Sequence, residues 1–141
     1  MRMYITEHRV TFVRSEGGKM PALTSISKKV YELLLKRSLL TLEIKSAHNI
    51  NALHPVKKGD FIFLTPILRE DLLPRTEGVI CEIQEKKVML QKKKHWDEVE
   101  IITVRLQVKL QCAARIRSVE KKGLDDGVAV EVDRAVRCPI S

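Results

Sequence analysis

The sequence lacks the features that mark membrane-spanning and secreted proteins. No apolar run in its 141 residues approaches the roughly 20 residues that a membrane-spanning helix needs. The first residues contain scattered arginines and no apolar block of about 7–15 residues of the kind found in secretory signals. We therefore expect a cytoplasmic protein without a membrane partner.

Motifs of metal, phosphate and nucleophile chemistry are also missing. The three cysteines, Cys81, Cys112 and Cys138, lie far apart, and no Cys-x-x-Cys or His-x-x-x-His pair offers zinc ligands. Cys81 and Cys112 each lie within an apolar strand pattern, which favours thiols that are buried as small hydrophobic groups. No glycine-rich phosphate loop and no Gly-x-Ser-x-Gly elbow occur. The sequence thus predicts no metal, no cofactor and no catalytic residue.

The sequence does have a large apolar fraction and an excess of positive charge. Apolar residues make up 44% of the chain, which favours a compact domain over a disordered tail. There are 26 Lys and Arg residues against 18 Asp and Glu, a net charge of +8 that favours polyanionic partners such as nucleic acid. The excess is concentrated in residues 21–60, where seven basic residues face three acidic ones. A solvated basic surface is the alternative interpretation.

The chain divides near Gly17–Gly18, a flexible break. Before it, residues 1–19 predict a loosely held N-terminal extension or an edge strand, with one strand over residues 5–13. Better-patterned sequence begins at Met20, which is a candidate functional start. From there, residues 20–141 predict a single domain.

One helix and about six short strands are predicted. The helix spans Ser25–Arg37, with Ser25 or Ser27 as its cap and an apolar stripe along one side. The longest alternation of apolar and polar residues covers Ile102–Cys112, and its length is typical of a strand that bends around a small barrel. The fold class is therefore mainly β (α+β), a small antiparallel β-barrel with one or two capping helices. The other predicted elements are strands at Phe61–Leu64, Ala113–Val119 and Val128–Val132, a loop with one helical turn over Pro66–Gly78, a hairpin of Val79–Ile83 and Val88–Leu90 with Gln84–Lys87 at its turn, and a turn at Lys122–Gly127.

A short strand that alternates over Leu40–Lys45 carries the candidate site. Because successive residues of a strand point to opposite faces, Thr41, Glu43 and Lys45 are expected to line one side. A carboxylate beside an ammonium can accept from the N–H groups of a nucleobase while the ammonium meets a phosphate. The alternative is an exposed ion pair of little energetic weight.

Other candidates lie in the segments that follow. A polar loop is expected after the strand, with His48 and His54 as groups that titrate near neutrality. It ends in a turn at Lys57–Asp60, where Gly59 and Asp60 are expected to be structural. In the next loop, Arg69 and Arg75 are candidates for anion contacts. The run Lys92–Trp96 pairs lysines with the only Trp and could contact nucleic acid, or could simply protect a sheet edge.

These residues resemble the motif of the ASCH family of PUA-like barrels. That family has Gly-x-Lys-x-x-Glu-x-Arg after a helix, followed by a Gly-Asp that opens the next strand. Glu43 and Gly59-Asp60 match the pattern, and Lys45 stands where Arg is usual. Ser38 and Leu40 stand at the positions of the family's Gly and Lys. Over most of its length the chain also resembles a small archaeal family of unknown function.

The resemblance implies a PUA-like fold whose cleft, lined by the motif strand, binds RNA or a modified nucleoside. Some ASCH proteins are small amidohydrolases that act on acylated cytidines with the motif Lys, and Leu40 replaces that Lys here. We therefore expect an RNA- or nucleotide-binding module. A nucleoside amidohydrolase and a protein-interaction module are the alternatives. The residues expected at the cleft are Thr41, Glu43, Lys45, His48 and Asn49, with Arg69 from the adjoining loop.

Overall fold

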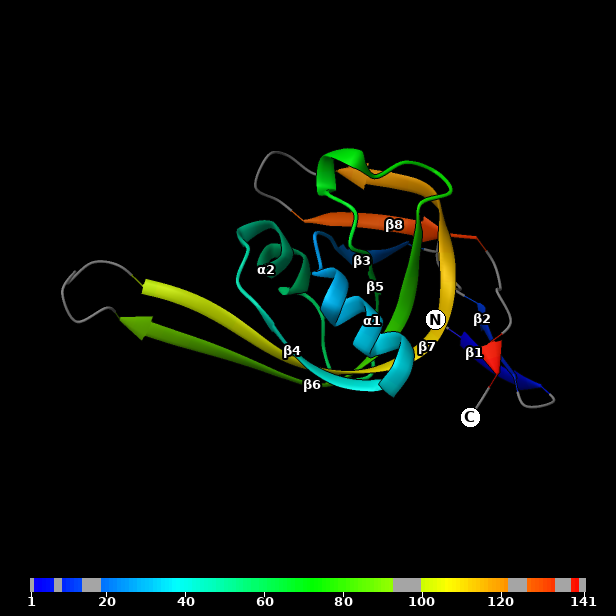
Figure 1. Ribbon diagram of the computed structural model, residues 1–141, viewed down its shortest axis with the longest axis horizontal. Coiled ribbons are helices and arrows are strands. Elements are labelled where there is room, and N and C mark those ends of the chain that lie inside the picture. Colours follow the sequence, from blue (N-terminus) through cyan, green and yellow to red (C-terminus); the bar gives the residue numbers. More distant parts are fainter. Residues whose placement is uncertain are drawn as a thin grey trace.

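The protein is mainly β with two α-helices, an α+β fold (Figure 1). The computed structural model describes residues 2–6, 9–13, 19–92, 100–121, 127–133 and 138–139, with side chains for 19–90, 102–121 and 127–133. Its elements in chain order are β1 (Arg2–Thr6), β2 (Arg9–Val13), β3 (Lys19–Leu23), α1 (Lys28–Arg37), β4 (Leu39–Ile44), α2 (Ala47–Leu53), β5 (Phe61–Leu64), the 3-10 helix η1 (Arg69–Asp71), β6 (Glu77–Lys92), β7 (Glu100–Lys121), β8 (Val128–Val132) and β9 (Cys138–Pro139).

The main sheet has six strands in the order β4-β7-β6-β5-β3-β8. Strand β8 also pairs with β7, so the pairings from β7 through β6, β5, β3 and β8 return to β7, and β4 lies at the outside edge. Figure 1 shows β7 curving under the helices and rising towards β8, and this curvature brings the two ends of the circuit together. Strands β3 and β5 are parallel, so the prediction of an antiparallel sheet is wrong at this pair. The chain between them crosses over through α1, β4 and α2, which is the length of connection that a parallel pair requires.

The core consists of two apolar clusters that share strand β5. Ile62 and Leu64 pack in a cluster with the buried side chains of α1, α2 and β4. Phe61 and Phe63 point to the opposite side, into a cluster with β3, β7 and β8. A strand covered on both faces has no position for a polar side chain, which explains the unbroken apolar run of β5. The sequence prediction of this buried strand is confirmed.

Helix α1 and strand β4 form where the sequence predicts them, but the helix begins three residues later than the predicted Ser25. The helix begins at Lys28, and the Ser27 hydroxyl caps it by accepting a hydrogen bond from the Val30 N–H at 3.2 Å. Leu34, on the inner side of this helix, is buried in the core. In β4, Leu42 and Ile44 face the core and Thr41 and Glu43 are exposed, the alternation that the sequence predicts.

The prediction of a polar loop after β4 is wrong, because the structure has helix α2 there. The helix is only seven residues long and has no side-chain cap at its start, so little in its own sequence marks it. Tertiary contacts hold it instead. Ala52 and Leu53 are buried, and the Lys86 ammonium donates to the carbonyl oxygens of Leu53 at 2.6 Å and Val56 at 2.9 Å, beyond its C-terminal end.

The hairpin predicted over Val79–Leu90 is wrong, because β6 is one continuous strand of 16 residues. Its register against β7 shifts between Ile80 and Cys81 and again between Ile83 and Glu85. These bulges interrupt the alternation of apolar and polar residues, and the interruption resembles the signal of a turn. Gln84–Lys87 contains none of the residues that favour turns. Beyond the second bulge, β6 and β7 continue as a ribbon that extends from the body (Figure 1).

Other predictions differ from the structure at the two ends of the chain. The single strand expected over residues 5–13 is replaced by β1 and β2, which pair antiparallel with each other, and β2 also pairs with β9. Strand β3 was not predicted. Gly17–Gly18, residues 93–96 of the lysine and tryptophan run, and residues 122–126 of the last predicted turn lie outside the described residues.

No helix in the described part of the chain combines the length and apolar character needed to cross a membrane. Among the same residues, no three His, Cys, Asp or Glu side chains gather where they could hold a metal ion. Cys81 and Cys112 are buried, as predicted, and burial raises the pKa of the Cys81 thiol to about 12.

The contact of Lys86 with the end of α2 predicts a measurable contribution to stability. We expect Lys86→Met, which keeps the aliphatic stem and removes the ammonium, to lower the free energy of unfolding by about 1–3 kcal/mol, because partly buried carbonyls lose their donors. Lys87→Met, at an exposed position one residue on, is the control and should change stability by less than about 0.5 kcal/mol. Urea unfolding of the three proteins measures both values, and equal stability of Lys86→Met and the parent would contradict the assignment.

Candidate functional site

A cavity of about 320 Å³ lies beside β4, between this strand and the segments that lead into the two helices. Thr41, Glu43, Lys45 and Asn49 all line it, so the structure brings together four of the six residues predicted for the cleft. Ser25 and Ser27 before α1, and Ser46 before α2, also line it.

The cavity runs along the free edge of β4. Five successive residues, Thr41–Lys45, line it, and their side chains alternate between the two faces of the strand. The Leu110 N–H donates to the Ser38 carbonyl, and the antiparallel register then places residues 40, 42 and 44 in hydrogen-bonded pairs with β7. The N–H and C=O groups of Thr41 and Glu43 therefore point away from β7, towards the open edge.

Glu43 forms an ion pair that the sequence did not predict. Its carboxylate accepts a hydrogen bond from the Arg105 guanidinium at 3.0 Å, across the β4–β7 pair. About half of each side chain is exposed (47% for Arg105 and 46% for Glu43), so the pair adds little to stability and stays accessible to a ligand. The alternation of β7 already placed Arg105 on the polar face. Only the register between the two strands could show that it faces Glu43.

Asn49 holds the backbone of the neighbouring strand. Its amide oxygen accepts from the Thr24 N–H at 3.0 Å, and its amide nitrogen donates to the Thr24 carbonyl at 2.9 Å. The side chain is only 4% exposed. These two bonds tie α2 to the end of β3, so Asn49 shapes one wall of the cavity.

The remaining predicted residues lie elsewhere. His48 is half-buried and its Nε2 lies 3.1 Å from the Thr24 hydroxyl, outside the lining of the cavity. Arg69 is buried on η1, at 9% exposure, and does not line the cavity. Gly59 has a positive φ of 92°, and the Asp60 carboxylate accepts from the Lys57 N–H at 2.8 Å, which is the geometry expected of a structural turn.

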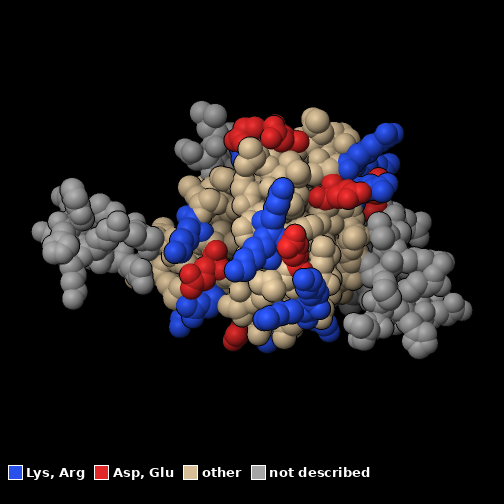
Figure 2. Space-filling view, viewed as in Figure 1, with Lys and Arg blue, Asp and Glu red and all other residues tan. Residues whose placement is uncertain are grey.

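Basic side chains surround this part of the molecule. Figure 2 shows Lys and Arg spread over the face on which α1 lies, with fewer acidic side chains between them. On α1, Lys28, Lys29, Lys36 and Arg37 are exposed. The positive charge predicted for residues 21–60 is therefore on the surface, next to the cavity.

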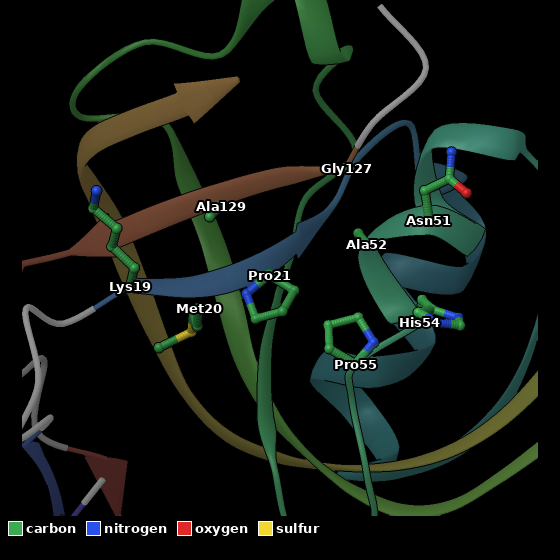
Figure 3. Close-up of a pocket in the computed structure, with 9 residues that line it drawn as sticks. All are labelled: Lys19, Met20, Pro21, Asn51, Ala52, His54, Pro55, Gly127 and Ala129. Atoms are coloured by element: carbon green, nitrogen blue, oxygen red, sulfur yellow. The ribbon is translucent and has the colours of Figure 1, made fainter. Parts of the chain in front are cut away.

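A second cavity, of about 420 Å³, lies on the other side of α2 and offers less polar chemistry (Figure 3). Pro21 and Pro55 lie side by side in it, and the Lys19 side chain points away and pairs with Glu120. His54 is the one imidazole among its lining residues. None of the six residues predicted for the cleft lines it.

The two bonds of Asn49 predict that this residue acts mainly on stability. We expect Asn49→Ala to lower the free energy of unfolding by about 2–4 kcal/mol, because it leaves the buried Thr24 N–H and C=O without these partners. Asn51→Ala, at an exposed position of the same helix, is the matched control and should cost about 1 kcal/mol or less. Thermal and urea unfolding measure the difference, and equal losses for the two variants would overturn it.

Comparisons with known proteins place the chain among its relatives. It is 30% identical over 96 residues to "Uncharacterized protein MJ0105" of the archaeon Methanocaldococcus jannaschii, a match that covers 67% of this chain and 63% of the relative. The structure is similar to the N-terminal domain of Mycobacterium avium complex Lon protease, with a TM-score of 0.48 and 16% identity over 83% of this chain and 54% of that chain. This chain thus spans less than two thirds of the length of either protein. Residues 18–130 match the model of the family described as "Protein of unknown function (DUF473)", and the chain belongs to that family.

Proposed function

We propose that this protein is an RNA- or nucleotide-binding module that uses the cavity beside β4. The observation that carries the proposal is the convergence of Thr41, Glu43 and Lys45 with the free backbone edge of their strand on one cavity of about 320 Å³. The exposed lysines and the arginine of α1 add positive charge nearby, which attracts a phosphate backbone.

Each group of the cavity has a role that its chemistry suits. The outward N–H and C=O groups of Thr41 and Glu43 supply donors and acceptors for a nucleobase edge, and the Glu43 carboxylate can accept from an exocyclic amine. The Lys45 ammonium suits phosphate oxygens, and so does the Arg105 guanidinium, which pairs with Glu43 but does not itself line the cavity. Asn49 contributes by shaping the wall of the cavity, because its amide is hydrogen-bonded to the backbone of Thr24.

The finer fold assignment belongs to this proposal. We take the closed circuit of strand pairings as a small PUA-like barrel, with β4 as the motif strand of an ASCH-like site. One detail supports the motif alignment. Ser38 has a positive φ of 56°, the left-handed conformation that favours glycine, and it stands where the ASCH motif has Gly. An RNA ligand would also fit a cytoplasmic protein.

Binding is proposed in preference to hydrolysis because of Leu40. This residue stands at the position of the motif Lys, and its side chain is partly buried against the core. Glu43 is exposed on the other face of β4. The strand therefore offers no amine at that position to assist attack on an acylated nucleoside.

Fluorescence anisotropy with a labelled pool of structured and single-stranded RNA tests the proposal. We expect affinity to fall steeply as salt rises, because phosphate contacts release counterions. Lys45→Ala should weaken binding several-fold and reduce the slope of log K against log salt by about one. Lys121→Ala makes the same charge change at the far end of β7 and is the control. An affinity unaffected by Lys45→Ala, or no binding at low salt, would refute the proposal.

Glu43→Ala separates base contact from general charge attraction. The substitution removes a negative charge and releases Arg105, so attraction to phosphate alone predicts tighter binding. If the carboxylate accepts from a nucleobase, we expect binding to weaken by about three- to tenfold despite the added positive charge. The same anisotropy titration measures the sign of the change, and tighter binding would remove Glu43 from the contact.

A further inference from the structure

A further hollow among the described residues shares no lining residue with the proposed RNA cavity. It has a volume of about 620 Å³ and is bounded by α1, the loop after β5, η1 and the start of β6. Its apolar part consists of Tyr31, Pro66, Ile67 and Leu68, and two carboxylates, Asp71 and Glu77, also line it.

The hollow exposes two adjacent aliphatic side chains. Ile67 is 37% exposed and Leu68 is 53% exposed. The next turn of α1 carries Leu35, which is 52% exposed and lies one turn after Tyr31 on the same side of the helix. Apolar surface of this kind, rimmed by polar groups, is typical of a binding site for another protein.

The backbone of this loop is held in place. The Ser25 N–H donates to the Ile67 carbonyl at 2.9 Å, and the Asp71 N–H donates to the Leu68 carbonyl at 2.9 Å. The Thr65 hydroxyl accepts from the Ile67 N–H and donates to the Glu77 carbonyl at 3.0 Å. These bonds hold the backbone of the two aliphatic residues in one arrangement, so docking of a partner would require little further ordering of this loop.

The charge at this hollow is opposite to that of the chain as a whole. The chain has a net charge of +8, yet Asp71 and Glu77 line the hollow and Glu70 is exposed beside them. Figure 2 shows acidic side chains along two sides of the uncharged surface between η1 and α1, with basic side chains beyond one of them and on the α1 side. Glu77 is 3.5 Å from the Arg115 guanidinium, but both side chains are mostly exposed (74% and 62%), so solvent screens this pair. The acidic rim repels a phosphate backbone and favours a cationic ligand.

We propose that this hollow is a docking surface for a basic, apolar segment of a partner protein. The leucine-type side chains of such a segment would fill the space between Tyr31 and Leu68, and its lysines or arginines would face Asp71 and Glu77. This surface and the cavity beside β4 are neighbours, joined by the bond from Ser25 to Ile67, but they share no lining residue. The protein would thus join an anionic ligand on one surface to a cationic segment on another.

The test uses two fluorescein-labelled synthetic peptides of the same length, one built from Leu and Lys and the other from Leu and Glu. We expect the Leu-Lys peptide to bind the full chain and the Leu-Glu peptide to bind at least about tenfold more weakly, because like charges meet at the rim. Leu68→Ser should weaken binding of the Leu-Lys peptide about tenfold, since a buried leucine side chain is worth that factor or more. Asp71→Asn should weaken it about threefold and lower its salt dependence.

The chain offers matched controls for both substitutions. Leu73 is more exposed than Leu68, at 65%, and does not line the hollow, so Leu73→Ser should leave binding unchanged. Glu85→Gln removes the same charge as Asp71→Asn from an exposed side chain of β6 outside the lining, and it should leave binding of the Leu-Lys peptide unchanged. Equal effects of Leu68→Ser and Leu73→Ser, or equal binding of the two peptides, would overturn the proposal.

Two further measurements distinguish other occupants. Sedimentation velocity of the chain alone would show a dimer that Leu68→Ser dissociates if a second copy covers the hollow, and that result would overturn the proposal. If RNA competes with the Leu-Lys peptide for the parent protein and this competition is lost in Leu68→Ser, RNA occupies the hollow. That result would also overturn the proposal. Circular dichroism and the thermal midpoint of each variant show that it is folded before its affinity is compared.

Discussion

The burial of β5 on both faces is the constraint on which the rest of the structure depends. Four apolar side chains alternate between two clusters, one under the helices and one enclosed by the strands. Each buried side chain of this size contributes about 1.5–3 kcal/mol relative to an exposed one. Because both clusters must close around the same short strand, β6 and β3 are paired to its two edges and the helices are drawn onto one side. The curvature of β7 follows, since this strand contributes side chains to both clusters.

The cavity beside β4 exists because α2 is fastened at both ends. Asn49 ties it to the backbone of β3, and the Lys86 ammonium binds carbonyls at its C-terminal end. These are polar contacts between residues that are 25 and 33 positions apart in the chain. With α2 held there, the segment from Thr41 to Ser46 is left with an open edge and a hollow beside it. A few buried or partly buried hydrogen bonds thus position the cavity, although the polar groups of β4 that line it are exposed.

The two surfaces that carry our proposals differ in charge and in apolar character. The cavity beside β4 combines polar side chains with a strand edge and lies among exposed basic residues. The hollow beside η1 combines exposed aliphatic side chains with carboxylates. Membership of the family described as "Protein of unknown function (DUF473)" covers residues 18–130, which include both surfaces. Both proposals therefore concern the part of the chain that the family model matches.

Several elements could be predicted from the sequence because their signals are local. The helix α1 has its cap in Ser27, apolar and polar residues alternate over Leu40–Ile44 of β4 and Ile102–Cys112 of β7, and the turn at Gly59 and Asp60 has its own chemistry. The same alternation identified Thr41, Glu43 and Lys45 as a polar row. Where the local signal was weak or misleading, the predictions differ from the structure. The sequence predicts a loop where the structure has α2, and a turn where β6 continues past its bulges.

The sequence by itself determined which side chains of β4 face outward and that positive charge gathers around that strand, since both follow from the order of residues. Only the tertiary structure decided that Arg105 faces Glu43, that Asn49 is engaged with Thr24, and that Arg69 is buried. These facts depend on strand register and on the packing of segments far apart in the chain. A pattern of period two fixes the face of a residue, but the residue across from it is fixed only when the strands pair.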